Sequence, residues 1–465
     1  MANERPNFIF ILLDDLGWAD LGCYGSTFHE TPRLDALAQE SMRFTDAYAA
    51  CPVCSPTRAS ILSGQYPARI PLTNFIAGQA RGRLLSAPYL HYLPLEHTSL
   101  AKALGEEDYA TWHIGKWHLG DEPYTPEAHG FDVNIGGWRA GRPETYFSPY
   151  KNPKLPDGPE GEYLTDRLTD EAIRLIENRD SRPFFMHLSY YAVHTPIEGK
   201  PELVEKYREK AAGMGLDKRD PFEVGEYFPC EHKMHKRVVR RRFQSDPGYA
   251  AMVQTVDTNI GRLLDALSAE GLADNTVVMF FSDNGGLSTA EGSPTCNAPL
   301  SEGKGWMYEG AVREPLIVRA PGLTRPDSIC RHPITSTDFY PTILELAGLD
   351  PRPRQHCDGV SFVPLLRGDE GFDRGPIFWH YPHYSNQGGR PGCSVREGDW
   401  KLIEFFEEGR RELYNLREDI SEDRNLVAYD EARVQRMGGM LHDWLKRVDA
   451  NIPEPNPDWP GPEDG

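Results

Sequence analysis

The sequence predicts an α/β sandwich, in which helices cover a mainly parallel sheet, followed by a smaller C-terminal α+β subdomain. Three patterns support this fold class: continuous apolar runs that end in polar clusters, helical segments between those runs, and a change of pattern after about residue 370. Continuous apolar runs suit strands that are buried on both faces. Such strands are typical of parallel sheets with helices on both sides.

Four apolar runs are the candidate central strands, and each is followed by polar residues. The runs cover residues 8–13, 109–112, 183–191 and 276–281. The polar residues that follow them are, in order, Asp14-Asp15, Lys116 with His118, His194, and Asp283-Asn284. Because ligands of open α/β sheets bind beyond the carboxyl ends of the strands, we expect these side chains to converge on one site.

The helical and C-terminal segments have their own signals. Thr31 followed by Pro32 reads as an N-cap and first helical position, and residues 248–267 repeat apolar side chains at helical spacing. Residues 399–406 and 412–416 predict an antiparallel hairpin, and residues 431–448 predict a helix before a Pro-rich tail that we expect to be disordered. We therefore divide the chain into a catalytic domain, 1–370, and a C-terminal subdomain, 371–465.

The composition limits the partners of the protein. Its 465 residues include 50 basic and 70 acidic side chains, which gives a net charge of -20. Such a charge repels nucleic acid and anionic membranes, so neither is an expected partner, and an anionic substrate requires a local basic site. The apolar runs are shorter than the roughly 20 residues that a membrane-spanning helix needs. Residues 1–6 contain no apolar signal segment, which predicts a cytoplasmic location, or a periplasmic or secreted one if a signal was trimmed.

The stretch ACPVCSPTRAS at residues 50–60 places two cysteines three positions apart. A structural zinc site needs a second close pair, which the chain lacks, and a redox pair needs a small βαβ context. Burial of both cysteines is the ordinary alternative. A fourth reading places Ser55 and Pro56 at the start of a helix that stops at Gly64. Cys54 then lies at a helix N-terminus, near Arg58, where an anion or an activated nucleophile is favoured.

Cys54-Ser55-Pro56-Thr57-Arg58, followed by Leu62-Ser63-Gly64, resembles the signature of the type I, formylglycine-dependent sulfatases of the alkaline-phosphatase-like superfamily. Pro56 and Arg58 have the family's register relative to Cys54 and not to Cys51. Cys51 is then a packing residue. Further motifs follow in family order: Asp14-Asp15, residues 115–120, His194-Thr195-Pro196, Ser282 to Gly285, Gly303-Lys304-Gly305, Glu309-Gly310 with Arg313, and residues 398–402. The departures are Thr57, Ala311 and Glu314, where the family more often has serine, glycine and valine.

The resemblance implies a large mixed, mostly parallel sheet between helices and a small C-terminal subdomain with an antiparallel sheet. It is closest to bacterial arylsulfatases and N-acetylgalactosamine-sulfatase-like carbohydrate sulfatases. The implied activity is hydrolysis of a sulfate ester on a sulfated carbohydrate, such as a GalNAc-sulfate, a glycosaminoglycan or another sulfated polysaccharide fragment. The implied partners are this substrate and a maturase that oxidises Cys54 to formylglycine (3-oxoalanine). The oligomeric state is left open.

Asp14, Asp15, Asp283 and Asn284 offer only oxygen ligands, which suits calcium or magnesium and not zinc. The resemblance favours calcium, also contacted by the modified Cys54. In the implied mechanism one hydroxyl of the hydrated aldehyde attacks sulfur and displaces the alcohol, and the other then loses a proton and expels sulfate, which regenerates the aldehyde. The family's roles carry over to the matching positions: the hydrate is held by Arg58 and His118, Lys116 lies near the sulfate, and the sulfate is contacted by Lys304 and His194, one of which protonates the leaving oxygen.

Clues to the substrate lie in residues 379–390, where aromatic side chains accompany His380, His383 and Arg390. We predict that these three residues bind the sugar, with a packing strip between domains as the equal alternative. The basic run 233–242 reads as a solvated face or as a guide for a polyanionic glycan.

Two other functions remain in view. Phosphonate or phosphate ester hydrolases share the superfamily, but they tend to have histidine after the second metal aspartate, so Asn284 favours sulfate. A non-catalytic, glycan-binding pseudo-sulfatase would be expected to lack Cys54, Arg58 or a metal carboxylate, and all are present.

Overall fold

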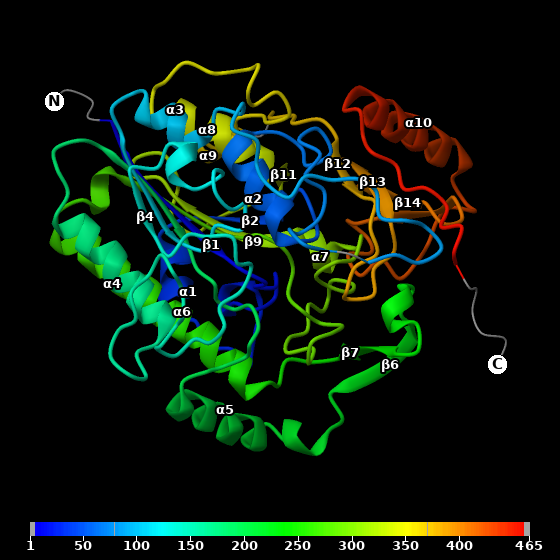
Figure 1. The fold of residues 1–465 in the computed structure, drawn as a ribbon, viewed down its shortest axis with the longest axis horizontal. Helices are drawn as coiled ribbons and strands as arrows, with labels where there is room; N and C mark the ends of the chain where they lie inside the picture. Colours follow the sequence, from blue (N-terminus) through cyan, green and yellow to red (C-terminus); the bar gives the residue numbers. More distant parts are fainter. Residues whose placement is uncertain (1–4, 79, 370, 460–465) are drawn as a thin grey trace.

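The computed structural model describes residues 5–78, 80–369 and 371–459. Its central feature is a nine-stranded sheet with helices on both faces (Figure 1). The strand order along the sheet is β10 (Ser328–Cys330), β2 (Met42–Tyr48), β9 (Arg313–Arg319), β8 (Thr276–Ser282), β1 (Asn7–Leu13), β5 (Phe184–Ser189), β3 (Ala110–Gly115) and β4 (Val133–Ile135), with β11 (Ile334–Thr335) also paired to β2.

The sheet is mixed and mostly parallel, as predicted. Strands β8, β1, β5 and β3 are neighbours and run parallel, whereas β9 is antiparallel to both β8 and β2. The four expected apolar runs are these four parallel strands, and every residue of each is buried. Their carboxyl ends therefore lie side by side at one edge of the sheet, which is where the polar clusters follow.

Two helical layers bury the two faces of the sheet. One layer contains α1 (Pro32–Gln39), α4 (Leu164–Glu177) and α6 (Pro247–Ala269). The other contains α2 (Cys54–Ser63), α3 (Leu100–Gly105), α8 (Phe339–Leu346) and α9 (Val363–Leu366). Apolar side chains of each layer pack on the alternate side chains of the central strands, for example Ile9 and Ile11 on one face and Phe8 and Phe10 on the other. Among the described residues, no helix is both long and apolar enough to cross a lipid bilayer.

The C-terminal subdomain is a four-stranded antiparallel sheet covered by one helix. Its strands are β12 (Ile377–Tyr381), β13 (Gly392–Glu397), β14 (Trp400–Phe405) and β15 (Arg410–Asn415), and α10 (Glu431–Arg447) packs on β13 and β14. Trp444 stacks on Phe378 with ring centroids 4.8 Å apart. The expected disorder of the tail does not hold for residues 449–459, because the backbone pairs there with Arg83 and Leu85; residues 460–465 lie outside the described part.

A buried ion cluster joins the two domains. It consists of Asp46, Glu309, Arg313, Arg396, Lys401 and Glu422, and we call it the interdomain cluster. The Lys401 Nζ lies 2.9 Å from both the Glu309 and the Glu422 carboxylates, and Arg396 Nη2 lies 2.9 Å from Asp46 Oδ1. Glu309 belongs to the short helix α7 (Glu309–Val312), directly before β9. The cluster fixes the C-terminal sheet against the edge of the main sheet.

An exposed helix and hairpin project beside the sheet: α5 (Pro201–Gly213), β6 (Phe222–Tyr227) and β7 (Arg237–Arg241) (Figure 1). The hairpin contains most of the basic run. Three of the six Lys and Arg side chains in the run pair with protein carboxylates: Arg240 with both Glu226 and Glu302, Arg241 with Asp246, and Arg242 with Glu223. This pairing leaves less free positive charge to guide a polyanion than the sequence alone suggests.

Candidate active site

The two acidic pairs predicted to bind a metal lie together at the carboxyl ends of β1 and β8. The two strands are parallel neighbours with Leu13 opposite Ser282, so the residues that follow them meet. Asp14, Asp15, Asp283 and Asn284 are all essentially inaccessible to solvent. Two of their oxygen atoms, Asp14 Oδ1 and Asn284 Oδ1, are buried and have no hydrogen-bond partner among the described residues. Buried oxygens without partners are unfavourable unless a ligand completes them.

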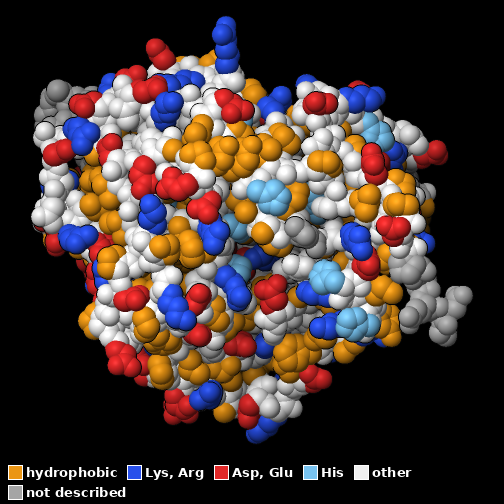
Figure 2. All heavy atoms as spheres, in the orientation of Figure 1, with side chains coloured by type: hydrophobic (Ala, Val, Ile, Leu, Met, Phe, Trp, Pro, Cys, Tyr) orange, Lys and Arg blue, Asp and Glu red, His pale blue; other side chains and the backbone are white. Residues whose placement is uncertain are grey.

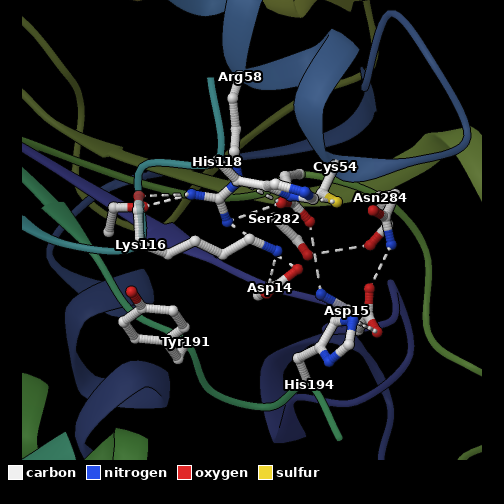
Figure 3. Close-up of polar contacts among 12 residues, drawn as sticks. Asp14, Asp15, Cys54, Arg58, Lys116, His118, Tyr191, His194, Ser282 and Asn284 are labelled. Atoms are coloured by element: carbon white, nitrogen blue, oxygen red, sulfur yellow. Dashed lines mark hydrogen bonds and ion pairs between the residues drawn. The ribbon is translucent and has the colours of Figure 1, made fainter. Parts of the chain in front are cut away.

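Three basic side chains surround the carboxylates, and Figure 3 labels two of them, Arg58 and Lys116. Lys116 Nζ donates to Asp14 Oδ2 at 2.6 Å, Lys304 Nζ lies 2.7 Å from Asp15 Oδ1, and Arg58 Nε donates to Asp283 Oδ2 at 2.8 Å. Burial opposes charge on Lys304, but Asp15 together with the other acidic groups around it outweighs that effect and raises the pKa of Lys304. Three carboxylates and three cations balance one another, so a divalent cation would add two positive charges, which a sulfate monoester (a monoanion) would offset in part and released sulfate (a dianion) in full.

Cys54 begins helix α2 and lies at the base of the site. The sequence placed it just before the helix, with Ser55 as N-cap. In the structure Val53 is the N-cap, and the helix ends as expected at Gly64, which has a positive φ of 69°. Cys54 Sγ lies 3.3 Å from His118 Nδ1. Burial raises the pKa of the Cys54 thiol against the opposing effect of Lys116 and Lys304, so the unmodified thiol is a poor nucleophile at neutral pH.

The two histidines are neutral in this environment. Burial and the charge of Lys116 hold the pKa of His118 well below its ordinary value. Burial and the charge of Lys304 lower the pKa of His194 to about 4, although its Nε2 lies 3.6 Å from Asp15 Oδ2. An anion bound between Lys304 and His194 would offset the positive charge of Lys304 and raise the pKa of His194.

A cavity of about 760 Å³ opens above these groups. Its base contains Cys54, His118, His194 and Lys304, and its wall contains Phe75, Ile76, Arg142, Asp246, Glu291, Asn386 and Gln387. Figure 2 shows a hollow near the middle of one face, with basic, acidic and histidine side chains around it. The volume lies within the range of pockets that hold small ligands, about 300–1,000 Å³.

The comparisons with known proteins agree with this geometry. Residues 6–349 match the sulfatase family, and residues 302–451 match the family described as N-sulphoglucosamine sulphohydrolase, C-terminal. A sulfatase of Formosa agariphila is 32% identical, over 97% of this chain and 90% of its own length. The chain belongs to the sulfatase family.

Further relatives agree with this assignment. The N-acetylgalactosamine-6-sulfatase of Mus musculus is 31% identical to this sulfatase, over 82% of the chain and 69% of its own length. The solved structure of Ps i-CgsB in complex with k-i-k-neocarrahexaose has a TM-score of 0.76 and 29% identity, and covers 95% of this chain and 93% of its own. This sulfatase is a sulfuric ester hydrolase.

The sulfatase family implies a divalent metal ion and a formylglycine residue, and the residues present fit both. Ligand atoms of Asp14, Cys54 and Asp283 all lie within 4.8 Å of one another. The two unpartnered oxygens of Asp14 and Asn284 supply further donors of the type that hard cations prefer. Cys54 lies where a modified side chain would contact both the cation and the cavity.

The structure brings the predicted catalytic and metal residues together but separates the predicted sugar-binding ones. His380 Nε2 bonds to the backbone oxygen of Asn451, and His383 lies between the hydroxyls of Thr73 and Ser86. Both histidines are buried, because this part of β12 and the loop after it is packed in the interior. Neither lines the cavity, so the structure corrects the prediction that they bind the sugar.

Arg390 also lies outside the cavity lining, and it pairs with Glu407. Sequence reasoning missed Asn386 and Gln387, which lie on the same loop and do line the cavity. Asn386 and Gln387 fall within the predicted stretch 379–390. Amide side chains are also common in ordinary turns, so the sequence does not mark these two residues as ligand contacts. Cys51 is buried beside Val53 in an apolar cluster, with its Sγ 3.8 Å from the backbone oxygen of Thr73, as a packing residue should be.

Proposed function

We propose that this sulfatase removes sulfate from a sulfated carbohydrate, using a formylglycine that a maturase forms from Cys54. The observation that supports this most directly is the position of Cys54 at the base of a sugar-sized cavity. Basic side chains and the unpartnered oxygens of Asp14 and Asn284 lie around it. We assign Ca²⁺, with Mg²⁺ as the alternative, to the oxygen donors of Asp14, Asp15, Asp283 and Asn284.

Hydrated formylglycine would supply a geminal diol as nucleophile, and the divalent cation would supply a positive charge that polarises the sulfuryl oxygens. The chain's own residues then have distinct roles. Arg58 donates to Asp283 and to the backbone oxygen of Lys116, which fixes the floor beneath Cys54. His118, 3.3 Å from Cys54 Sγ, is placed to hold a hydroxyl at that position and to accept its proton.

Lys304 and His194 divide the work at the sulfate. Lys304 stays charged because Asp15 raises its pKa, so it binds the anion and does not give up a proton. His194 is neutral until an anion offsets the Lys304 charge, and it then becomes protonated close to the ester oxygen. We therefore assign protonation of the leaving alcohol to His194 and anion binding to Lys304.

The carbohydrate part of the proposal comes from the cavity and from the relatives. A cavity of about 760 Å³ with mixed polar walls suits a hydroxyl-rich ring. Two relatives support the same class by name: an N-acetylgalactosamine-6-sulfatase, and a structure in complex with a neocarrahexaose. Asn284, whose Nδ2 donates to Asp15 Oδ1 at 2.8 Å, favours sulfate over phosphonate or phosphate.

The test is to measure which anion the mature enzyme releases from a panel of singly sulfated hexoses and hexosamines, an aryl sulfate and an aryl phosphonate. We expect sulfate from at least one sulfated sugar, and faster than from the aryl ester. Sulfate from the aryl ester alone would contradict the carbohydrate assignment. Release from the phosphonate alone would establish the alternative hydrolase. A protein that binds the sugars and releases nothing would be a pseudo-sulfatase.

A further inference from the structure

The cavity wall contains a carboxylate close to the lysine assigned to the sulfate. Glu291 lines the cavity together with Lys304, and its charge contributes to the raised pKa of Lys304. The two do not form an ion pair among the described residues, since Lys304 pairs with Asp15 instead. A negative charge beside an anion site weakens anion binding, so its presence calls for a compensating contact.

The position of Glu291 is fixed by the C-terminal subdomain. Gln387 Nε2 donates to Glu291 Oε1 at 3.0 Å, and Glu291 Oε2 has no protein partner among the described residues. Gln387 is itself buried and held from two sides. Its backbone oxygen accepts from Thr289 Oγ1 at 2.8 Å and from Trp306 Nε1 at 3.1 Å. Glu291 is solvent-exposed at the cavity wall, and the hydrogen bond from Gln387 orients its carboxylate there.

The loop that holds Gln387 is packed directly against the segment that holds Lys304. A Cβ built on Gly389 would lie 1.9 Å from the backbone oxygen of Gly305, so only glycine permits this approach. Gly388 has a positive φ of 111° in the same turn. This contact places Gln387, the donor to Glu291, beside the segment that holds Lys304.

The chemistry of a fixed carboxylate oxygen next to a sulfate site favours one kind of ligand group. A carboxylate accepts strong hydrogen bonds from hydroxyl groups and repels sulfate and carboxylate. Asp246, which also lines the cavity, is paired with Arg241, and Arg142 brings a positive charge to the same wall, so Glu291 is the carboxylate of the lining that has no ion pair among the described residues. A sugar ring that bears one sulfate and free hydroxyls therefore matches this wall, whereas a ring with a second anionic group there does not.

We propose that Glu291 is a specificity-determining residue, positioned by Gln387, which accepts a hydrogen bond from a free hydroxyl of the ring that bears the scissile sulfate and excludes a second anionic group at that place. This inference rests on the proposed function, because it names the substrate class of the same site.

The test compares two esters that differ in hydroxyl groups: 4-nitrophenyl sulfate, and the singly sulfated hexose or hexosamine that the wild type hydrolyses fastest. The measured quantity is the ratio of kcat/KM for the sugar to kcat/KM for the aryl ester. For Glu291→Gln we expect this ratio to fall about tenfold or more, because a hydrogen bond to a charged acceptor is lost only with the sugar. A smaller fall would overturn the inference.

Two further variants complete the test: one removes the hydrogen-bond donor to Glu291, and the other is a charge-matched control. Gln387→Met removes the donor that orients Glu291 and should lower the same ratio, through a higher KM for the sugar. Glu209→Gln removes an equal charge from the exposed side of α5 and should leave the ratio at the wild-type value. A Glu209→Gln variant that lowers the ratio as far as Glu291→Gln would overturn the assignment to Glu291. If the wild type released no sulfate from either ester, the proposed function would fail before any variant was compared, and this inference with it.

Discussion

The floor of the active site and the interdomain cluster are both buried, and each contains three acidic and three basic side chains. In the interdomain cluster, Glu309 Oε1 pairs with Lys401, and Glu309 Oε2 accepts from the Tyr48 hydroxyl and pairs with Arg313. In the active site, Asp14 Oδ1 and Asn284 Oδ1 have no hydrogen-bond partner among the described residues, and the neighbouring Cys54 and Lys304 line a cavity. Buried charge alone is therefore not the mark of a site; what marks it here is buried oxygens without partners next to groups that line a cavity.

The largest expected effect separates the nucleophile from its neighbour in the sequence. Cys54→Ala should reduce sulfate release by at least about 10⁴-fold, because no other group on this chain replaces the nucleophile. Cys51→Ala is the matched control. It removes a buried thiol three residues earlier that faces apolar side chains, and it should retain turnover. Thermal unfolding checks that both variants fold, and substantial turnover by Cys54→Ala would contradict the mechanism.

Metal removal tests whether the unpartnered oxygens belong to a ligand site. A chelator should abolish turnover, and Ca²⁺ should restore it. Ca²⁺ at a hundredfold excess over its Kd should also stabilise the fold by about 2.7 kcal/mol through mass action. Asp14→Asn should remove most of this thermal shift. A melting temperature that does not respond to Ca²⁺, Mg²⁺ or the chelator would contradict a metal site at these residues.

Substitutions in the interdomain cluster should lower the stability of the fold and leave turnover nearly unchanged. Lys401→Met leaves Glu309 and Glu422 without their buried cation and should lower the free energy of unfolding by about 3–5 kcal/mol. Lys446→Met, at the exposed end of α10, should change it by less than about 0.5 kcal/mol. The turnover of folded Lys401→Met should stay near that of the wild type. A large loss of turnover with unchanged stability would mean that this cluster belongs to the active site.

A smaller effect is the pH dependence of stability in the same cluster. Burial raises the pKa of Glu422 from 4.5 to about 7, with Lys401 opposing the rise. The folded state then binds this proton more tightly than the unfolded state, so the contribution of Glu422 to stability is greatest below pH 4.5 and is lost as the pH rises through about 7. The loss amounts to at most about 3 kcal/mol. The difference in unfolding free energy between the wild type and Glu422→Gln, measured at acidic and alkaline pH, should shrink or reverse accordingly; a constant difference would contradict it.

The central strands and most of the site residues were predictable from the sequence. The strands β1, β3, β5 and β8 were predictable because burial on both faces produces continuous apolar runs. The catalytic and metal residues followed because they come directly after these strands or at the start of α2. The motifs around Glu309, Arg313 and Lys401 were visible too, but nothing in the sequence separated their role between the domains from a role in the site.

The substrate wall was not predictable, and the reason is physical. Glu291 and Gln387 come from irregular loops, where no periodicity constrains the residue type, and the close packing of Gly389 on Gly305 brings the Gln387 loop to the cavity wall where Glu291 lies. The aromatic and histidine strip 379–384 suited a sugar platform and an interdomain packing strip equally. Trp379 donates to the backbone oxygen of Ala49, so the structure favours packing. In the sequence, Glu314 is only a departure from the family pattern. In the structure it is buried, its two carboxylate oxygens have no partner among the described residues, and burial raises its pKa.

The central claim is that Cys54, once oxidised, is the nucleophile of this sulfatase. The most direct measurement quantifies, by peptide mass spectrometry, the fraction of Cys54 converted to formylglycine in preparations made with and without a maturase, and compares it with sulfate release from the best sulfated sugar. We predict that the specific activity is proportional to the converted fraction and vanishes in protein that retains the thiol. Full activity in unconverted protein would contradict the account.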